Sequence, residues 1–139
     1  MLAVGIPTYS MNLATLAEDK KQQVRFLNNW YIQNIVEKEN YKSRALDEML
    51  ENWMIAGKNE NLYFALNSAE RFTIGDGNFQ LLNASVKKNL LLQGESKAKY
   101  RLCFYDHIGN LIEEKAEISL EKPLEISQEA MLVTGETVV

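Results

Sequence analysis

Residues 99–105 have the sequence KYRLCFY, in which Tyr100, Leu102 and Phe104 alternate with Arg101, Cys103 and Tyr105. This alternation predicts a β-strand, because successive side chains of a strand point to opposite faces of a sheet. Both faces of this strand are partly apolar, which favours a central strand that helices cover on one side. The stretch therefore predicts a sheet in the C-terminal half of the chain.

The same period continues on both sides of that strand. It predicts further strands at about 79–86, 89–93, 111–120 and 124–133. Two turn signals accompany them. The glycine-rich run at 75–78 predicts a hairpin, and a second hairpin is expected at 106–110, where Asp106 can form an Asx-turn and Gly109 or Asn110 can adopt a positive φ.

Upstream of the sheet, apolar residues recur at helical spacing. A first helix is expected from near Ser10 or Asn12 to about Glu39, with one apolar stripe and an amide-rich opposite face. The spacing of Leu46, Met49, Leu50 and Trp53 predicts a second helix at about 43–56. Residues 59–70 fit either a helix or a strand, and we favour the helix.

These elements predict an α+β fold in which two or three N-terminal helices pack on a curved antiparallel sheet of about five to six strands. We expect one domain over residues 1–139, helical at about 10–70 and a sheet at about 71–134. The order of elements resembles the cone-shaped nuclear-transport-factor-2-like architecture, which includes VirB8-type secretion components as well as pocket enzymes. A pilin-like chain, with one long helix laid on a sheet, is the alternative.

Composition limits the classes of function. The net charge of −4 provides no broad basic field for nucleic acid, so no nucleic-acid partner is expected. The apolar runs are too short to cross a membrane, so no membrane insertion is expected. A cytoplasmic location is the default expectation, with a periplasmic or secreted one if a leader or anchor has been removed.

Few side chains are suited to catalysis or metal binding. The chain has one cysteine, Cys103, and one histidine, His107, which lies in the predicted turn, so a Cys–His pair is disfavoured. The carboxylates at Glu113, Glu114 and Glu117 indicate a solvated strand edge rather than metal ligands. We therefore expect no catalytic residue, no metal and no cofactor, and the sequence favours a protein that is not an enzyme.

The remaining signals indicate recognition. Aromatic residues ringed by neutral polar groups are typical of protein interfaces, and Asn28, Trp30, Tyr31 and Asn34 form such a set on the first helix. The first hypothesis is a non-enzymatic protein–protein interaction or assembly module, with a protein partner or a homo-oligomer. The alternatives are a small-molecule-binding protein or enzyme with a pocket between helices and sheet, and a VirB8-like or pilin-like component of a secretion or pilus assembly trimmed of its membrane anchor.

The C-terminal residues match a second recognition pattern. Thr137 lies two residues before the terminal Val139, which is the arrangement that PDZ domains of the first class recognise. A tail of this kind adds as a strand to the PDZ sheet, with its carboxylate held by backbone N–H groups. A PDZ-type partner is therefore a further hypothesis.

Overall fold

The computed structural model describes residues 18–39, 42–46, 52–57, 59–67, 70–85, 89–95, 97–127 and 129–138. Its helical elements are α1 (Glu18–Tyr31) and a π-helix, η2 (Ile32–Val36), that continues it. Its strands are β1 (Arg44–Ala45), β2 (Asn52–Ala56), β3 (Asn61–Asn67), β4 (Arg71–Ile74), β5 (Phe79–Ser85), β6 (Asn89–Gly94), β7 (Lys99–Tyr105), β8 (Leu111–Ser119), β9 (Leu124–Ser127) and β10 (Leu132–Val138). The described part of the chain is therefore mostly sheet.

The strands form two sheets. A seven-stranded sheet has the order β1-β2-β3-β5-β10-β7-β8, and a three-stranded sheet has the order β4-β6-β9. From β3 to β6 the chain alternates between the sheets, with β3 and β5 in the large sheet and β4 and β6 in the small one. Within each sheet these two strands pair in parallel. The other pairs are antiparallel.

One apolar cluster lies between the two sheets. It includes Tyr63 of β3, Phe72 of β4, Phe79 of β5, Leu92 of β6 and Tyr100 of β7, each at most 2% exposed. The rings of Phe79 and Tyr100 meet edge to face at 5.5 Å between centroids. This dry aromatic core joins the sheets, because burial of such large rings removes the most apolar surface from water.

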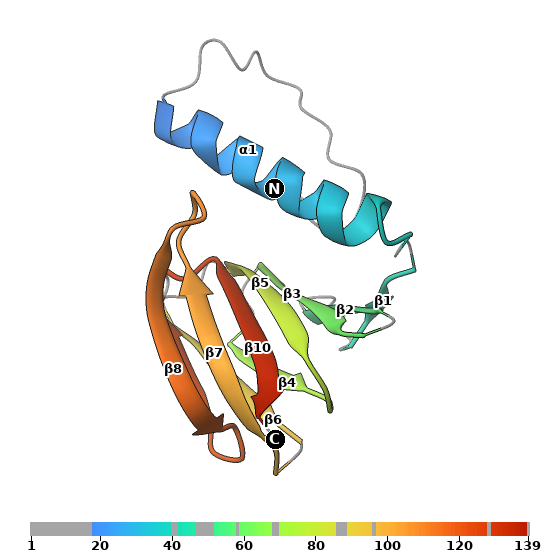
Figure 1. The fold of residues 1–139 in the computed structure, drawn as a ribbon, viewed down its shortest axis with the longest axis vertical. Coiled ribbons are helices and arrows are strands. Elements are labelled where there is room, and N and C mark those ends of the chain that lie inside the picture. Colours follow the sequence, from blue (N-terminus) through green and yellow to red (C-terminus); the bar gives the residue numbers. More distant parts are fainter. Residues whose placement is uncertain are drawn as a thin grey trace.

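A second cluster lies on the opposite face of the seven-stranded sheet, under the helix. Leu27, Trp30, Tyr31 and Ile35 pack there against residues of β2, β3, β5 and β10, among them Phe64. Figure 1 shows α1 crossing one end of the sheet, near the tip of the β7–β8 hairpin. The described residues thus form three layers: the helix, the large sheet and the small sheet.

The predicted fold class was wrong. Residues 44–45 and 52–56 form strands instead of a second helix, and residues 61–67 form β3 where we favoured a helix. Because β3 buries side chains on both faces, its apolar run lacks the period-2 pattern that identifies a strand. The consecutive apolar residues Trp53, Met54 and Ile55 of β2 give no such pattern either. The described residues therefore do not form the two or three helices of the nuclear-transport-factor-2-like or VirB8-like order, nor a purely antiparallel sheet.

Two boundaries in the sheet half also need correction. Residues 75–78 connect β4 to β5, which belong to different sheets, so this turn does not close a hairpin. The strand predicted at 124–133 is divided between β9 in the small sheet and β10 in the large one. The strands predicted at 79–86, 89–93, 99–105 and 111–120 are confirmed within one residue at each end.

The first helix and the second turn agree with prediction where they can be compared. Helical structure covers residues 18–36, and the expected start near Ser10 or Asn12 lies outside the described residues. In the β7–β8 hairpin, Asp106 Oδ1 accepts hydrogen bonds from the backbone N–H groups of Ile108 and Asn110, and Gly109 has a φ of 90°. No helix among the described residues has the length and apolarity needed to traverse a bilayer.

Candidate functional site

An open groove of about 630 Å³ lies between the helix and the sheet. The helical side contributes four exposed polar residues: Gln22, Arg25, Asn29 and Gln33. The sheet side contributes Thr134 and Leu132 of β10, Tyr105 of β7, and Ile108 in the hairpin. The groove lies beside the buried contacts that Leu27, Trp30 and Ile35 make with the sheet, and exposed polar side chains of the helix line it.

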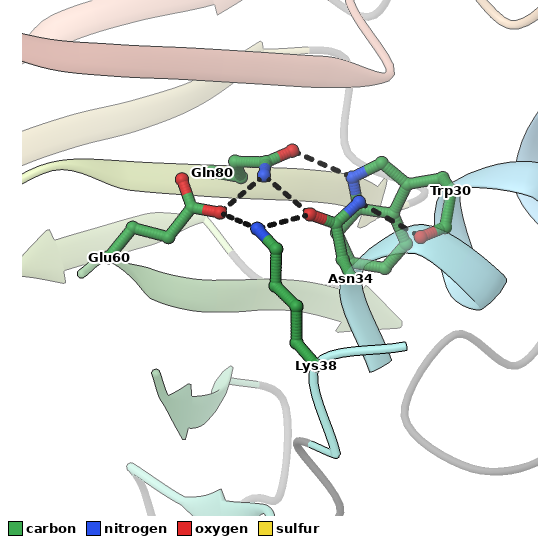
Figure 2. A network of polar contacts seen from close by, with 5 residues as sticks. All are labelled: Trp30, Asn34, Lys38, Glu60 and Gln80. Carbon is green, nitrogen blue, oxygen red and sulfur yellow. Dashed lines mark hydrogen bonds and ion pairs between the residues drawn. The ribbon is translucent and has the colours of Figure 1, made fainter. Parts of the chain in front are cut away.

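One end of the groove is closed by a network of five side chains (Figure 2). Gln80 of β5 is at its centre: its amide oxygen accepts from Trp30 Nε1 at 2.8 Å, and its Nε2 donates to Asn34 Oδ1 and Glu60 Oε1, each at 2.8 Å. Lys38 Nζ donates to the same Glu60 oxygen at 3.0 Å. The network fixes η2 against the sheet, because each partly buried polar group in it has a partner.

The opposite end is closed by the β7–β8 hairpin. His107 Nε2 lies 2.7 Å from Asp19 Oδ1 in the first turn of α1, with both side chains exposed. Gly109 lies so close to the ring of Phe26 that an added Cβ would come within 2.8 Å of Phe26 Cδ1. The glycine therefore serves both the positive φ of the turn and the close approach of the hairpin to α1.

Tyr105 lines the groove with its hydroxyl beside Thr134 and Cys103. Burial raises the pKa of Tyr105, the nearby Cys103 raises it further, and a hydrogen bond with Thr134 lowers it slightly. The phenol is consequently neutral at physiological pH. It can donate or accept a hydrogen bond, as the hydroxyl of Thr134 can.

The lining is nearly free of charge. Among the described lining residues Arg25 is the single charged one, and it forms a loose, exposed ion pair with Glu18 at 3.7 Å. No group of three or more metal-ligating side chains occurs among the residues that the structure describes. The groove thus offers amides, hydroxyls and one guanidinium to a ligand.

The residues predicted as an interaction face occupy different positions around this groove. Trp30, Tyr31 and Asn34 are buried, with 5%, 6% and 6% of their surface exposed, and Trp30 and Asn34 contribute to the groove wall. Asn28 is half-buried and is not part of the groove lining. Whether these residues contact a partner stays a prediction, since no partner chain is present.

The predicted C-terminal tail motif is part of the sheet where it is described. Thr137 belongs to β10, and its backbone N–H and its hydroxyl both donate to Asn78 Oδ1, at 2.9 and 3.1 Å. Val139 lies outside the described residues. A PDZ domain would have to separate Thr137 from Asn78 before the tail could join its sheet, so that partner also stays a prediction.

Sequence reasoning missed Gln80 and Glu60, which organise one end of the groove. A signal for Gln80 was available: it is the single polar residue in the run Phe79–Leu82, and a polar residue flanked by core positions needs a partner.

Cys103 is half-buried beside the Tyr105 hydroxyl, and His107 pairs with an exposed carboxylate rather than with the thiol.

Comparison with known proteins gives no assignment for this site. The chain matches no protein-family model, and no curated protein or solved structure is significantly similar to it. The groove must therefore be interpreted from its own chemistry.

Proposed function

We propose that the chain is a non-enzymatic protein-interaction module whose binding site is the groove between α1 and the seven-stranded sheet. The observation that carries the proposal is the described lining of amides and hydroxyls, with Arg25 as its one charged group, over an apolar floor. Amides and hydroxyls cost less to desolvate than charged groups, and a partner's polar groups can find both donors and acceptors among them. The residues assigned to contact are Gln22, Arg25, Asn29 and Gln33.

Adjacent asparagines of α1 provide a matched test. Asn29 lines the groove and Asn28 does not, although the two are neighbours of the same residue type. A photoreactive benzoylphenylalanine placed at either position would label whatever lies within a few ångströms. We expect a discrete covalent adduct from position 29, with a partner protein or a second copy of the chain, and little or none from position 28.

The outcomes of this labelling separate three interpretations. An adduct from position 29 alone supports the groove. An adduct from position 28 alone supports the face predicted from the sequence and contradicts the groove. No adduct from either position, in cells that contain the native partners, would count against the interaction module itself.

A small-molecule-binding protein is the second candidate. Its support is the groove volume of about 630 Å³, within the range of roughly 300–1,000 Å³ found for ligand pockets, together with the hydroxyl-bearing residues Tyr105 and Thr134 in the lining. The open shape favours the first candidate, since ligand pockets enclose most of a small molecule. A metabolite that raises the unfolding temperature of the wild type but not of Asn29→Trp would favour the second.

A further inference from the structure

The amide side chains along the groove are arranged in a row. Gln22, Asn29 and Gln33 are all exposed on the groove side of the helix, and none makes a side-chain hydrogen bond within the described part of the chain. At about 1.5 Å per residue, the row from Gln22 to Gln33 is about 16 Å long. An extended chain covers about 3.3 Å per residue, so the row matches about five residues of extended peptide.

The chemistry of the row also matches a peptide backbone. A side-chain amide provides N–H donors and a C=O acceptor, which are the same groups that each peptide bond presents. Three amides along one wall, with Thr134 on the opposite wall, can therefore satisfy several backbone groups of a bound segment. The floor beneath them is apolar, with Leu132 buried and Ile108 half-buried.

The charge of the lining limits the sequence of that segment. Arg25 is positive and no carboxylate is among the described lining residues, so a basic peptide would find no counter-charge along these walls. An acidic group can pair with Arg25, whose present partner Glu18 is 3.7 Å away and exposed. Surface pairs of this kind contribute little, so exchanging Glu18 for a ligand carboxylate costs little.

The aromatic side chains argue against a ligand that must stack on a ring. Trp30 has 5% of its surface exposed and its indole N–H is bonded to Gln80, while Phe26 and Tyr105 are packed against the core under the helix. Trp30 is buried and Phe26 and Tyr105 are half-buried, so the rings of the described lining leave limited area for an oligosaccharide to stack on.

We infer that the groove binds an extended peptide segment of about five residues, uncharged or acidic, with one apolar side chain against Ile108 and Leu132. This inference rests on the proposed function and specifies its partner: a linear segment of another protein rather than a folded surface. The occupant is recognised through its backbone, which makes the groove tolerant of sequence except for charge and one apolar position.

The test is selection of a phage-displayed library of random linear peptides on the wild-type protein, followed by binding measurements with one enriched peptide carrying fluorescein. We expect enriched sequences to share an apolar residue flanked by uncharged or acidic ones. The labelled peptide should lose at least about tenfold in affinity for Asn29→Trp, and retain its affinity for Asn28→Trp. An acidic peptide should lose a similar factor for Arg25→Glu.

Circular dichroism and unfolding midpoints establish that each variant is folded. If Asn29→Trp is not folded, Gln33→Trp, at another exposed wall position, replaces it. The inference is overturned if no peptide is enriched, if the enriched peptides are basic, or if they bind the groove variant as tightly as the wild type. Groove-dependent binding to an array of neutral oligosaccharides would also overturn it.

The proposed function fails separately. An adduct from position 29 with no enriched peptide leaves the interaction module in place and eliminates the linear segment. Absence of both eliminates the module and the segment together.

Discussion

Replacing Gln80 by leucine should destabilise the protein by about 2–4 kcal/mol. The substitution removes three hydrogen bonds, with Trp30, Asn34 and Glu60, all at 2.8 Å. Loss of the acceptor leaves the indole N–H of the 5%-exposed Trp30 without its partner, which costs about 1–3 kcal/mol. Asn34 and Glu60 keep their contacts with Lys38. Loss of their hydrogen bonds to Gln80 therefore adds only about 1 kcal/mol to the cost.

Urea titration followed by far-UV circular dichroism measures this change. A double-mutant cycle with Trp30→Phe isolates the central contact, because phenylalanine has no N–H to leave unpaired. In the Trp30→Phe background, Gln80→Leu should cost about 1 kcal/mol, which gives a coupling of about 1–3 kcal/mol between the two positions. Equal costs of Gln80→Leu in both backgrounds would refute the view that Gln80 holds the helix through the indole.

Two further predictions concern the core between the sheets. Gly135→Ala should lower the free energy of unfolding by about 2–3 kcal/mol, because an added Cβ would lie 2.6 Å from Phe79 Cζ. The control Gly75→Ala, whose Cβ would meet Tyr63 Oη at 3.6 Å, should change it by less than about 1 kcal/mol. Similar costs for the two variants in urea titrations would contradict this prediction. Tyr100→Phe should leave stability at pH 7 unchanged or raise it by up to about 1 kcal/mol, because the buried Tyr100 hydroxyl has no hydrogen-bond partner among the described residues. Burial raises the pKa of Tyr100, and Asp76 and Tyr63 raise it further, so the unfolded chain ionises first and wild-type stability falls as pH rises above about 10. The variant should lose less stability than the wild type between pH 7 and about 10.5, and an equal loss would show that another group is responsible.

In the sheet half of the chain, the sequence predicts a strand correctly when apolar and polar residues alternate in it. It also does so when recognisable turn residues flank the strand. β7 and β8 meet at a turn whose Asp106 and Gly109 act as their residue types predict. β3 could not be predicted in this way, because Leu62 and Phe64 pack under the helix while Tyr63 and Ala65 pack between the sheets. In a strand that is buried on both faces, polar and apolar residues do not alternate. The burial of both faces of β3 follows from the three-layer arrangement, with the helix on one side of the large sheet and the small sheet on the other.

The groove could be predicted only in part. The amide-rich face of the first helix was visible in the sequence, including Asn29 and Gln33. Its opposite wall depends on Thr134 and Tyr105, which are brought under the helix by the order of β10 and β7 in the large sheet. Sequence patterns identify the polar or apolar face of a helix or strand. Which strands lie under the helix depends on the strand order of the large sheet, which these patterns do not give.

The amides of α1 also explain why the groove remains open. Leucine at positions 29 and 33 would let the helix extend its apolar contact toward Leu132 and Ile108, and each buried leucine would contribute about 1.5–3 kcal/mol. That gain is substantial against the roughly 5–15 kcal/mol that stabilise a typical domain. The Gln80 network holds the helix at one end of the groove, and the β7–β8 hairpin holds it at the other. Apolar residues between these two contacts could therefore pack against the sheet, yet the residues there are polar. Under the proposed function, recognition of a ligand would account for those polar residues, for which stability alone gives no reason.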